Sequence, residues 1–262
     1  MQTRYGDVAV ALADQVATVE IQRPPNNFFD TDLIRSLAAA FEALDSEAAC
    51  RAIVLAAAGK HFCAGANFHN QDDQADRQAR RVETENPLYA EAVRLFACRK
   101  PTVGAIQGAA IGGGFGLALV PDFRVLCPET RFSANFVKLG FHPGFGLTYT
   151  LPRLIGWQRA NLIFYTGRRV GGEEAFAWGL GEILTDQDNV RAAALELAKE
   201  IAENAPLAVQ STRATMRAGI AAAVKSATDH EFKEQHWLQR TEDHKEGIRA
   251  VAERRPGRFV GR

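Results

Sequence analysis

Apolar residues recur along the N-terminal part of the chain at two spacings, one typical of strands and one of helices. The apolar runs Val8–Leu12 and Val16–Gln22 are separated by three residues and predict a β-hairpin. From Asp30 to about Asp45 the apolar residues follow the helical period, and Asp30 is of a type that caps a helix. Ala52–Ala57 is apolar throughout, which predicts a strand covered on both faces.

The alternation of strands and helices continues beyond this strand. Pro87 opens a helix to about Arg99, and Thr102–Gln107 predicts a second buried strand. A glycine cluster at 108–116 leads into another helix, and Phe123–Leu126 predicts a third strand. This order predicts an α/β fold with a parallel sheet flanked by helices. Residues 69–86 are polar and lack a clear period, so they predict a mobile loop or a poorly packed helix.

After residue 190 the pattern is helical only. Four segments have the helical character, at 190–204, 206–222, 224–240 and 243–254. We therefore divide the chain into an α/β body, residues 1–190, and a C-terminal helical region, residues 191–262. The apolar face of such a tail has to be buried against another surface.

Charge and cysteine content narrow the classes of function. Lysine plus arginine and aspartate plus glutamate number 31 each, so the balance favours neither nucleic acid nor an anionic membrane as a partner. The four cysteines have no C-x-x-C spacing, which predicts reduced thiols in a cytoplasmic protein and no metal site. The first residues lack the pattern of a signal peptide. Residues 101–121 carry no charge, but their six glycines predict a buried strand, turn and helix rather than a membrane span.

Two loops of small residues are the candidates for the functional site. Gly59–Asn67 follows one buried strand, and Gly108–Gly116 lies between another strand and a helix. Small residues let a ligand approach the backbone, and the start of a helix offers unpaired N–H groups. Two such loops side by side could direct two N–H groups at one oxygen and form an oxyanion hole. Tight packing of strand on helix explains the same glycines and stays open here. The glycines complete neither a dinucleotide fingerprint nor a phosphate-binding loop.

Five short motifs give the chain a resemblance to a known family. They are Phe62-Cys63-Ala64-Gly65-Ala66, residues 106–114 (IQGAAIGGG), residues 139–146 (LGFHPGFG), Thr166-Gly167-Arg168, and the tail pieces Glu246-Gly247, Arg255-Pro256 and Phe259. In this order and spacing they resemble the crotonase, or enoyl-CoA hydratase/isomerase, superfamily over nearly the whole chain.

The resemblance implies a fold, a ligand and an assembly. The fold would be a crotonase-like spiral of ββα units, residues 1–190, with a helical trimerisation region at residues 191–262. The ligand would be coenzyme A carrying an acyl thioester, with no other cofactor and no metal. The assembly would be a homotrimer or a dimer of trimers.

The resemblance also implies roles for single residues. The N–H groups of Ala66 and Gly113 would hold the thioester oxygen. Arg254 would bring charge to the phosphates of coenzyme A, although a solvated helix face explains it equally well. The remaining residues that the resemblance places around the substrate are Pro25 and Asn26 near the CoA entrance, Ala64 and Gly65 along the pantetheine and adenine, and Asn67, Gly112, Gly116 and Phe136 at the acyl group. Asn67 has a second reading as a turn residue that binds its own backbone.

The sequence departs from the family at the two positions that define hydration. Family hydratases carry one glutamate on the helix after the glycine cluster and another about twenty residues later. Here those positions read Gly116 and Phe136, and neither side chain can transfer a proton. His142 is the first candidate for a substitute base, because a neutral histidine is a base near neutral pH, but a hydrogen-bonded structural role is the more common one for such a histidine. Glu83, Glu85 and Glu91 are further candidates, and nothing in the sequence selects one of them.

We therefore expect an enoyl-CoA hydratase/isomerase-like enzyme, a lyase or isomerase, that stabilises a thioester enolate or oxyanion with two backbone N–H groups. The alternatives are an acyl-CoA decarboxylase or thioester hydrolase of the same fold, and a CoA-binding protein without catalysis.

Overall fold

The computed structural model describes residues 2–66 and 86–262, and their main feature is a seven-stranded sheet. Its strand order is β1-β2-β3-β4-β5-β7-β10. β1, β2 and β3 pair antiparallel, and β3, β4, β5, β7 and β10 pair parallel. The bounds are Arg4–Tyr5 for β1, Val8–Ala13 for β2, Val16–Ile21 for β3, Ala52–Ala57 for β4, Thr102–Ile106 for β5, Phe123–Leu126 for β7 and Ile183–Leu184 for β10. The predicted hairpin, the predicted parallel sheet and the α/β class are confirmed.

The central strand β4 is buried at every position because both faces of the sheet are covered. Ile53, Leu55 and Ala57 belong to the main core, whereas Ala52 and Val54 belong to a second cluster on the other face. In that second cluster the helix α8, Val190–Ala202, contributes a small or branched side chain at every fourth position. The stripe consists of Val190, Ala194, Ala198 and Ala202. The helix therefore lies close against the sheet.

The helices of the body cover the opposite face and lead to a second, smaller sheet. The α1 helix, Thr31–Asp45, is capped by the Asp30 carboxylate as predicted, and it packs on α3, Pro87–Phe96. The three-stranded sheet has the order β6-β8-β9. Its strands are Ala109–Ile111, Arg131–Ser133 and Arg169–Gly171. Between β6 and β7 runs the short helix α4, Gly113–Ala118, whose six residues are all buried.

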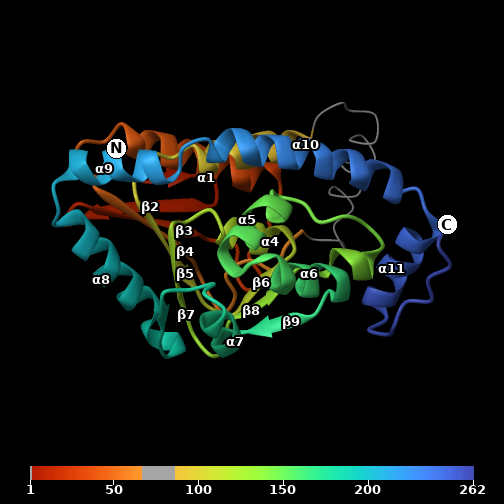
Figure 1. Ribbon diagram of the computed structural model, residues 1–262. Coiled ribbons are helices and arrows are strands. Elements are labelled where there is room, and N and C mark those ends of the chain that lie inside the picture. The colour runs from red at the N-terminus through yellow and green to blue at the C-terminus, as the bar shows by residue number, and fades with distance from the viewer. Residues whose placement is uncertain (1, 67–85) are drawn as a thin grey trace.

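The C-terminal helices run around the outside of the body (Figure 1). α9, Pro206–Met216, and α10, Ile220–Leu238, lie along the top of the view, and α11, Glu242–Ala252, lies at the end near the C-terminus. α10 packs on α3 and on α5, Leu147–Ile155. α11 packs on the 3₁₀ helix η2, Asn135–Leu139. The tail therefore contacts the body along most of its length.

Three predictions about elements differ from the structure or lie outside it. The segment 206–222, predicted as one helix, is broken at Gly219, which adopts a left-handed φ of +76° just before α10. Residues 128–189, for which the pattern predicted no elements, form several short ones. They are β8, η2, α5, α6 (Trp157–Thr166), β9, α7 (Gly172–Ala177), β10 and η3 (Gln187–Asn189). The loop or helix predicted at 69–86 falls almost wholly outside the described residues.

Residues 101–121 form the buried strand, turn and helix that their glycines predicted. They contain β5, β6 and α4. No helix within residues 2–66 and 86–262 has both the length and the apolar character needed to cross a membrane.

Candidate active site

The two small-residue loops lie side by side in the structure. Cys63 and Ala110 form a parallel bridge, in which the Cys63 N–H donates to Ala109 O at 2.9 Å and the Ile111 N–H donates to Cys63 O at 3.0 Å. From the sequence we considered these loops side by side, and the hydrogen bonds show that they are joined by one parallel bridge.

Ala66 and Gly113 follow this bridge closely, since each stands three residues beyond its paired residue in the sequence. Ala66 is half-buried, and Gly113 is the first residue of α4. Gly112 is tied down separately, since its N–H donates to Ser133 O at 2.8 Å. Within the described residues, neither the Ala66 N–H nor the Gly113 N–H donates a hydrogen bond to the protein. In the part of the chain that the structure describes, both N–H groups are thus without a protein acceptor.

Residues 23–29 hold the first loop in place through backbone hydrogen bonds. The Ala64 N–H donates to Asn26 O at 2.9 Å, and the Phe29 N–H donates to Gly65 O at 3.0 Å. Gly65 has a φ of +88°, and a Cβ there would lie 2.7 Å from Ile111 O, so only glycine fits between the loops. The structure thus brings Asn26, Ala64 and Gly65 together beside Ala66. Pro25 precedes Asn26 and follows a cis peptide bond.

A buried amide that sequence reasoning missed fixes the same region. Asn27 has no exposed surface, and its Nδ2 donates to Ala58 O at 2.8 Å and to His61 O at 2.7 Å. Its Oδ1 accepts from the Arg23 N–H at 2.9 Å. Buried amides persist when their polar atoms are bonded, as here. The neighbouring prolines signalled a turn, but only the fold shows which loop Asn27 holds.

Cys63, at the centre of the pairing, is not available as a nucleophile. The thiol is fully buried, and burial raises its pKa to about 12. Because the thiolate is the reactive form, a thiol with this pKa is inert near neutral pH. The Cys63 thiol is therefore a packing group of this region and not its nucleophile.

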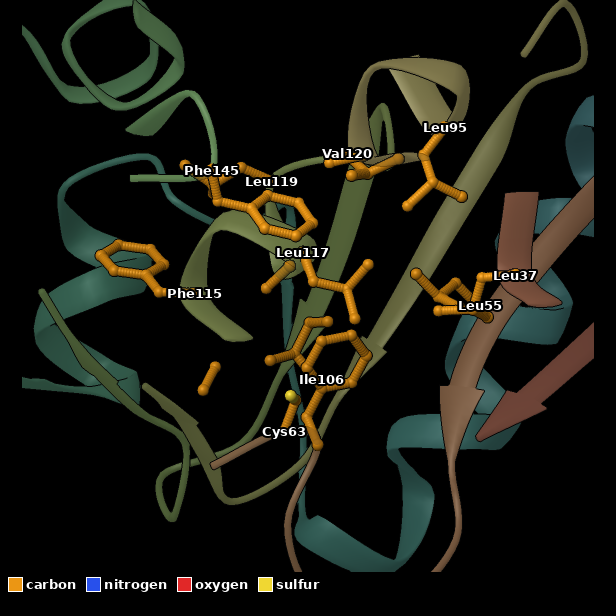
Figure 2. Packing of buried hydrophobic residues seen from close by; sticks show 14 of the residues in the cluster. Leu37, Leu55, Cys63, Leu95, Ile106, Phe115, Leu117, Leu119, Val120 and Phe145 are labelled. Carbon is orange, nitrogen blue, oxygen red and sulfur yellow. The ribbon is translucent and has the colours of Figure 1, made fainter. Parts of the chain in front are cut away.

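Gly116 and Phe136, which stand where family hydratases carry glutamate, both lie next to aromatic rings. Gly116 is buried next to Phe145, which is itself only 1% exposed. Phe136 lies on η2, packs edge-on against Phe141 at 5.5 Å between ring centroids, and faces Gly112. Figure 2 shows Phe145 among the buried side chains around Leu117 and Leu119 of the α4 segment. The surroundings of α4 are therefore hydrocarbon on this side.

His142 lies in the wall of a large apolar cavity rather than against the two loops. Its Nδ1 is 2.8 Å from Pro143 O, and its ring meets the His230 ring edge-on at 5.9 Å between centroids. The cavity has a volume of about 620 Å³ and also includes Phe141, Trp157 and Phe164 in its lining. Of the described residues, Ala66 and Gly113 do not line it. The structure thus does not join His142 to the two free N–H groups.

The remaining candidates are spread over the molecule. Arg254 is exposed just beyond α11, with a left-handed φ of +53°, and its charge contacts neither loop in the described residues. Glu91 forms ion pairs with Arg35 and Arg94, so its carboxylate is already engaged. Asn67, Glu83 and Glu85 lie outside the described residues.

Comparison with known proteins points in the same direction as the motifs. The sequence model of the enoyl-CoA hydratase/isomerase family matches residues 12–262. The crotonyl-CoA hydratase of Syntrophomonas wolfei is 29% identical, with 98% of this chain and 99% of that protein covered. The short-chain-enoyl-CoA hydratase of Clostridium acetobutylicum is 29% identical over 92% of each protein. The crystal structure of an enoyl-CoA hydratase/isomerase from Pseudoalteromonas atlantica matches with a TM-score of 0.85 and 26% identity, covering 97% of this chain and 100% of that one.

Proposed function

Since this chain belongs to the enoyl-CoA hydratase/isomerase family, we propose that it holds the thioester oxygen of an acyl-CoA between the N–H groups of Ala66 and Gly113. The observation that carries the proposal is the Cys63–Ala110 pairing, which joins the two loops three residues before each of these positions. Both N–H groups lack an acceptor among the described residues. Donors that are fixed before the reaction stabilise charge as it develops on an oxygen, and each is worth about 3–4 kcal/mol.

The proposal extends to the coenzyme A portion of the substrate. Ala64 and Gly65 precede the first donor and would lie along the pantetheine and adenine, with Pro25 and Asn26 at the entrance. The bond from the Ala64 N–H to Asn26 O supports this grouping, because it ties the entrance to the loop. Arg254 would add a positive charge near the phosphates, and this role rests on the family resemblance alone.

The reaction proposed is one that passes through a thioester enolate or oxyanion and does not need the glutamate pair of hydratases. Gly116 and Phe136 carry no proton-transferring group. Isomerisation of an enoyl-CoA by a base other than this glutamate pair is the first candidate. Decarboxylation or thioester hydrolysis is the second, and the hydrocarbon wall beside Gly116 favours decarboxylation because loss of CO₂ needs the oxyanion site but no second carboxylate.

The assembly proposed is a homotrimer or a dimer of trimers. Large apolar side chains on α6 and α9 are exposed in the single chain, at 70% for Trp157, 75% for Tyr165, 80% for Leu207 and 80% for Met216. We infer that these exposed apolar side chains are buried against neighbouring subunits. The number of subunits comes from the family resemblance.

Turnover of a panel of acyl-CoA thioesters tests the proposal. The panel includes crotonyl-CoA, a 3-enoyl-CoA, an acyl-CoA with a carboxyl group on the α carbon, and a saturated acyl-CoA, with products followed by mass spectrometry. Isomerised, decarboxylated or hydrolysed product identifies the reaction. Tight binding of these thioesters without any product supports the non-catalytic alternative, and failure to bind any of them contradicts the proposed function.

A further inference from the structure

One face of the α4 helix carries no side chains, and two aromatic rings fill the space instead. Gly113 and Gly116 stand three residues apart and so share a face of the helix. A Cβ at Gly113 would lie 2.2 Å from Phe29 Cζ, and a Cβ at Gly116 would lie 2.7 Å from Phe145 Cβ and 2.8 Å from Phe145 Cδ1. The Phe29 and Phe145 rings meet edge to face, with centroids 5.9 Å apart. The volume of a side chain at 116 is therefore already occupied.

Phe145 occupies this space with a strained backbone conformation. Its φ is +63°, in the left-handed region that favours glycine. A bulky residue held there costs on the order of 1–3 kcal/mol and persists only where the surroundings enforce it. The preceding residue, Gly144, is tightly packed, because a Cβ there would lie 2.0 Å from Tyr89 Oη.

A buried carboxylate on α10 enforces this conformation. Glu231 has no exposed surface, and it accepts hydrogen bonds from the Gly146 N–H at 2.8 Å, the Thr148 N–H at 3.1 Å and Thr148 Oγ1 at 2.6 Å. One turn further along, Gln235 Nε2 donates to His142 O at 2.9 Å. Buried polar groups persist when they are bonded in this way. Glu231 and Gln235 thus hold the loop on both sides of Phe145.

We propose that Phe145 is a specificity-determining residue and that Glu231 is its positioning residue. The Glu231 carboxylate fixes residues 146 and 148 so that the Phe145 ring fills the space beside Gly116. A hydrocarbon wall then stands where a longer side chain at 116 would reach the acyl group, and it excludes the water that hydration requires. The packing stands on the contacts alone, whereas its effect on the reaction rests on the proposed acyl-CoA function.

The first experiment is a cycle of Gly116→Glu, Phe145→Gly and the double substitution. We expect Gly116→Glu alone to lower the melting temperature, because the glutamate collides with the ring. The added Phe145→Gly should recover part of that loss. We expect the double variant to hydrate crotonyl-CoA at least about tenfold faster than the wild type, since one positioned acid or base is worth about 10²–10⁴-fold. Gly116→Glu alone should show no gain.

The outcomes of this cycle separate the packing from the function. If Gly116→Glu alone is as stable as the wild type, Phe145 does not compete for the space and the proposal is wrong. If the double variant binds crotonyl-CoA and gains no hydration, the wall does not set specificity. If the wild type and all variants fail to bind crotonyl-CoA, the proposed function fails, while the melting temperatures still report on the packing.

The second experiment tests Glu231 through its dependence on Phe145. We expect Glu231→Gln to change the KM or kcat for crotonyl-CoA by about threefold or more when Phe145 is present, as for residues coupled by contact. The same substitution in a Phe145→Gly background should have no effect on these constants. Glu234→Gln is the matched control, because Glu234 lies on the same helix and bonds to the exposed Trp237 instead. If Glu231→Gln has an equal effect in both backgrounds, the role of Glu231 is purely structural and the proposal is wrong.

Discussion

Cys63 and Ala110 face each other across a single parallel bridge, which joins the two loops that contain Ala66 and Gly113. The bridge needs two hydrogen bonds, from the Cys63 N–H and the Ile111 N–H, so a shift by one residue would turn one loop relative to the other. Ala66 follows Cys63 by three residues in the sequence, and Gly113 follows Ala110 by the same number. The register of this residue pair thus fixes how the two loops lie against each other at the bridge.

Replacing Ala66 by proline removes one of the two donors. We expect Ala66→Pro to lower kcat on the best substrate by about 10²–10³-fold, because one oxyanion donor is worth about 3–4 kcal/mol. Ala66→Gly is the matched control, since it keeps the N–H and should retain most of the activity. The measurement is steady-state kinetics on folded protein. Full turnover by Ala66→Pro would remove Ala66 from the oxyanion site.

Hydration of crotonyl-CoA should be slow in the wild type. General acid–base help is worth about 10²–10⁴-fold for each positioned group, and Gly116 and Phe136 supply none. The assay follows loss of the enoyl absorbance beside a conventional hydratase. A rate within about tenfold of that control would imply a substitute base, and His142→Ala would then test whether His142 is that base.

Asp122 is expected to stabilise the fold rather than to act in catalysis. Its carboxylate accepts from Arg213 Nε at 2.7 Å, from Arg217 Nη1 at 2.8 Å and from the Thr102 N–H at 2.9 Å, and so links α9 to the sheet. Asp122→Ala leaves two largely buried guanidinium groups without this partner, and we expect the free energy of unfolding to fall by about 3 kcal/mol. Asp229→Ala, which removes an exposed partner of Lys225, should cost about 1 kcal/mol or less. Equal losses in chemical denaturation would contradict this difference.

The stability contributed by Glu246 should depend on pH in the acid range. The Arg255 guanidinium and the Arg258 N–H lower the pKa of Glu246 from 4.5 to about 2. A carboxyl whose pKa is lowered in the folded state stabilises that state above its ordinary pKa and loses this effect as pH falls. Glu246→Gln should therefore reduce the free energy of unfolding at pH 7, and its difference from the wild type should shrink between pH 4.5 and 2. A difference that stays constant over this range would show that the ion pair contributes nothing.

Light scattering should give the mass of three or six chains at micromolar concentration. The exposed apolar residues of α6 and α9 supply the surface to be buried. Trp157→Glu and Leu207→Glu each place a charge on this surface and should shift the population towards single chains. A single-chain mass for the wild type would contradict the proposed assembly.

The sequence was most informative where one local cause decides the structure. Asp30 caps α1, and the apolar run Ala52–Ala57 is a strand covered on both faces, as their residue types predicted. Residues 128–189 gave no clear prediction, because their strands have only two or three residues and are too short to show a period. The break at Gly219 was missed because the apolar spacing continues across it.

The candidate site was predictable in its backbone but not in its surroundings. The motifs around Ala66 and Gly113 are continuous in sequence, and short-range glycine patterns identified them. The contacts of Glu231 with Gly146 and Thr148 join residues more than eighty positions apart, and a lone glutamate on a tail helix gives no sign of burial. Phe145 stood inside a motif, yet its collision with a side chain at Gly116 exists only in three dimensions.

The close packing of α8 on the sheet has a consequence for folding during synthesis on the ribosome. The strands β3, β4, β5 and β7 are complete by residue 126, but the helix that covers their second face ends only at Ala202. Until that helix emerges, a stripe of alanine and valine side chains on an otherwise formed sheet faces water, and such surfaces associate with one another. A nascent chain released before α8 would therefore aggregate, and a chaperone that shields this face during the intervening elongation would raise the yield of folded protein.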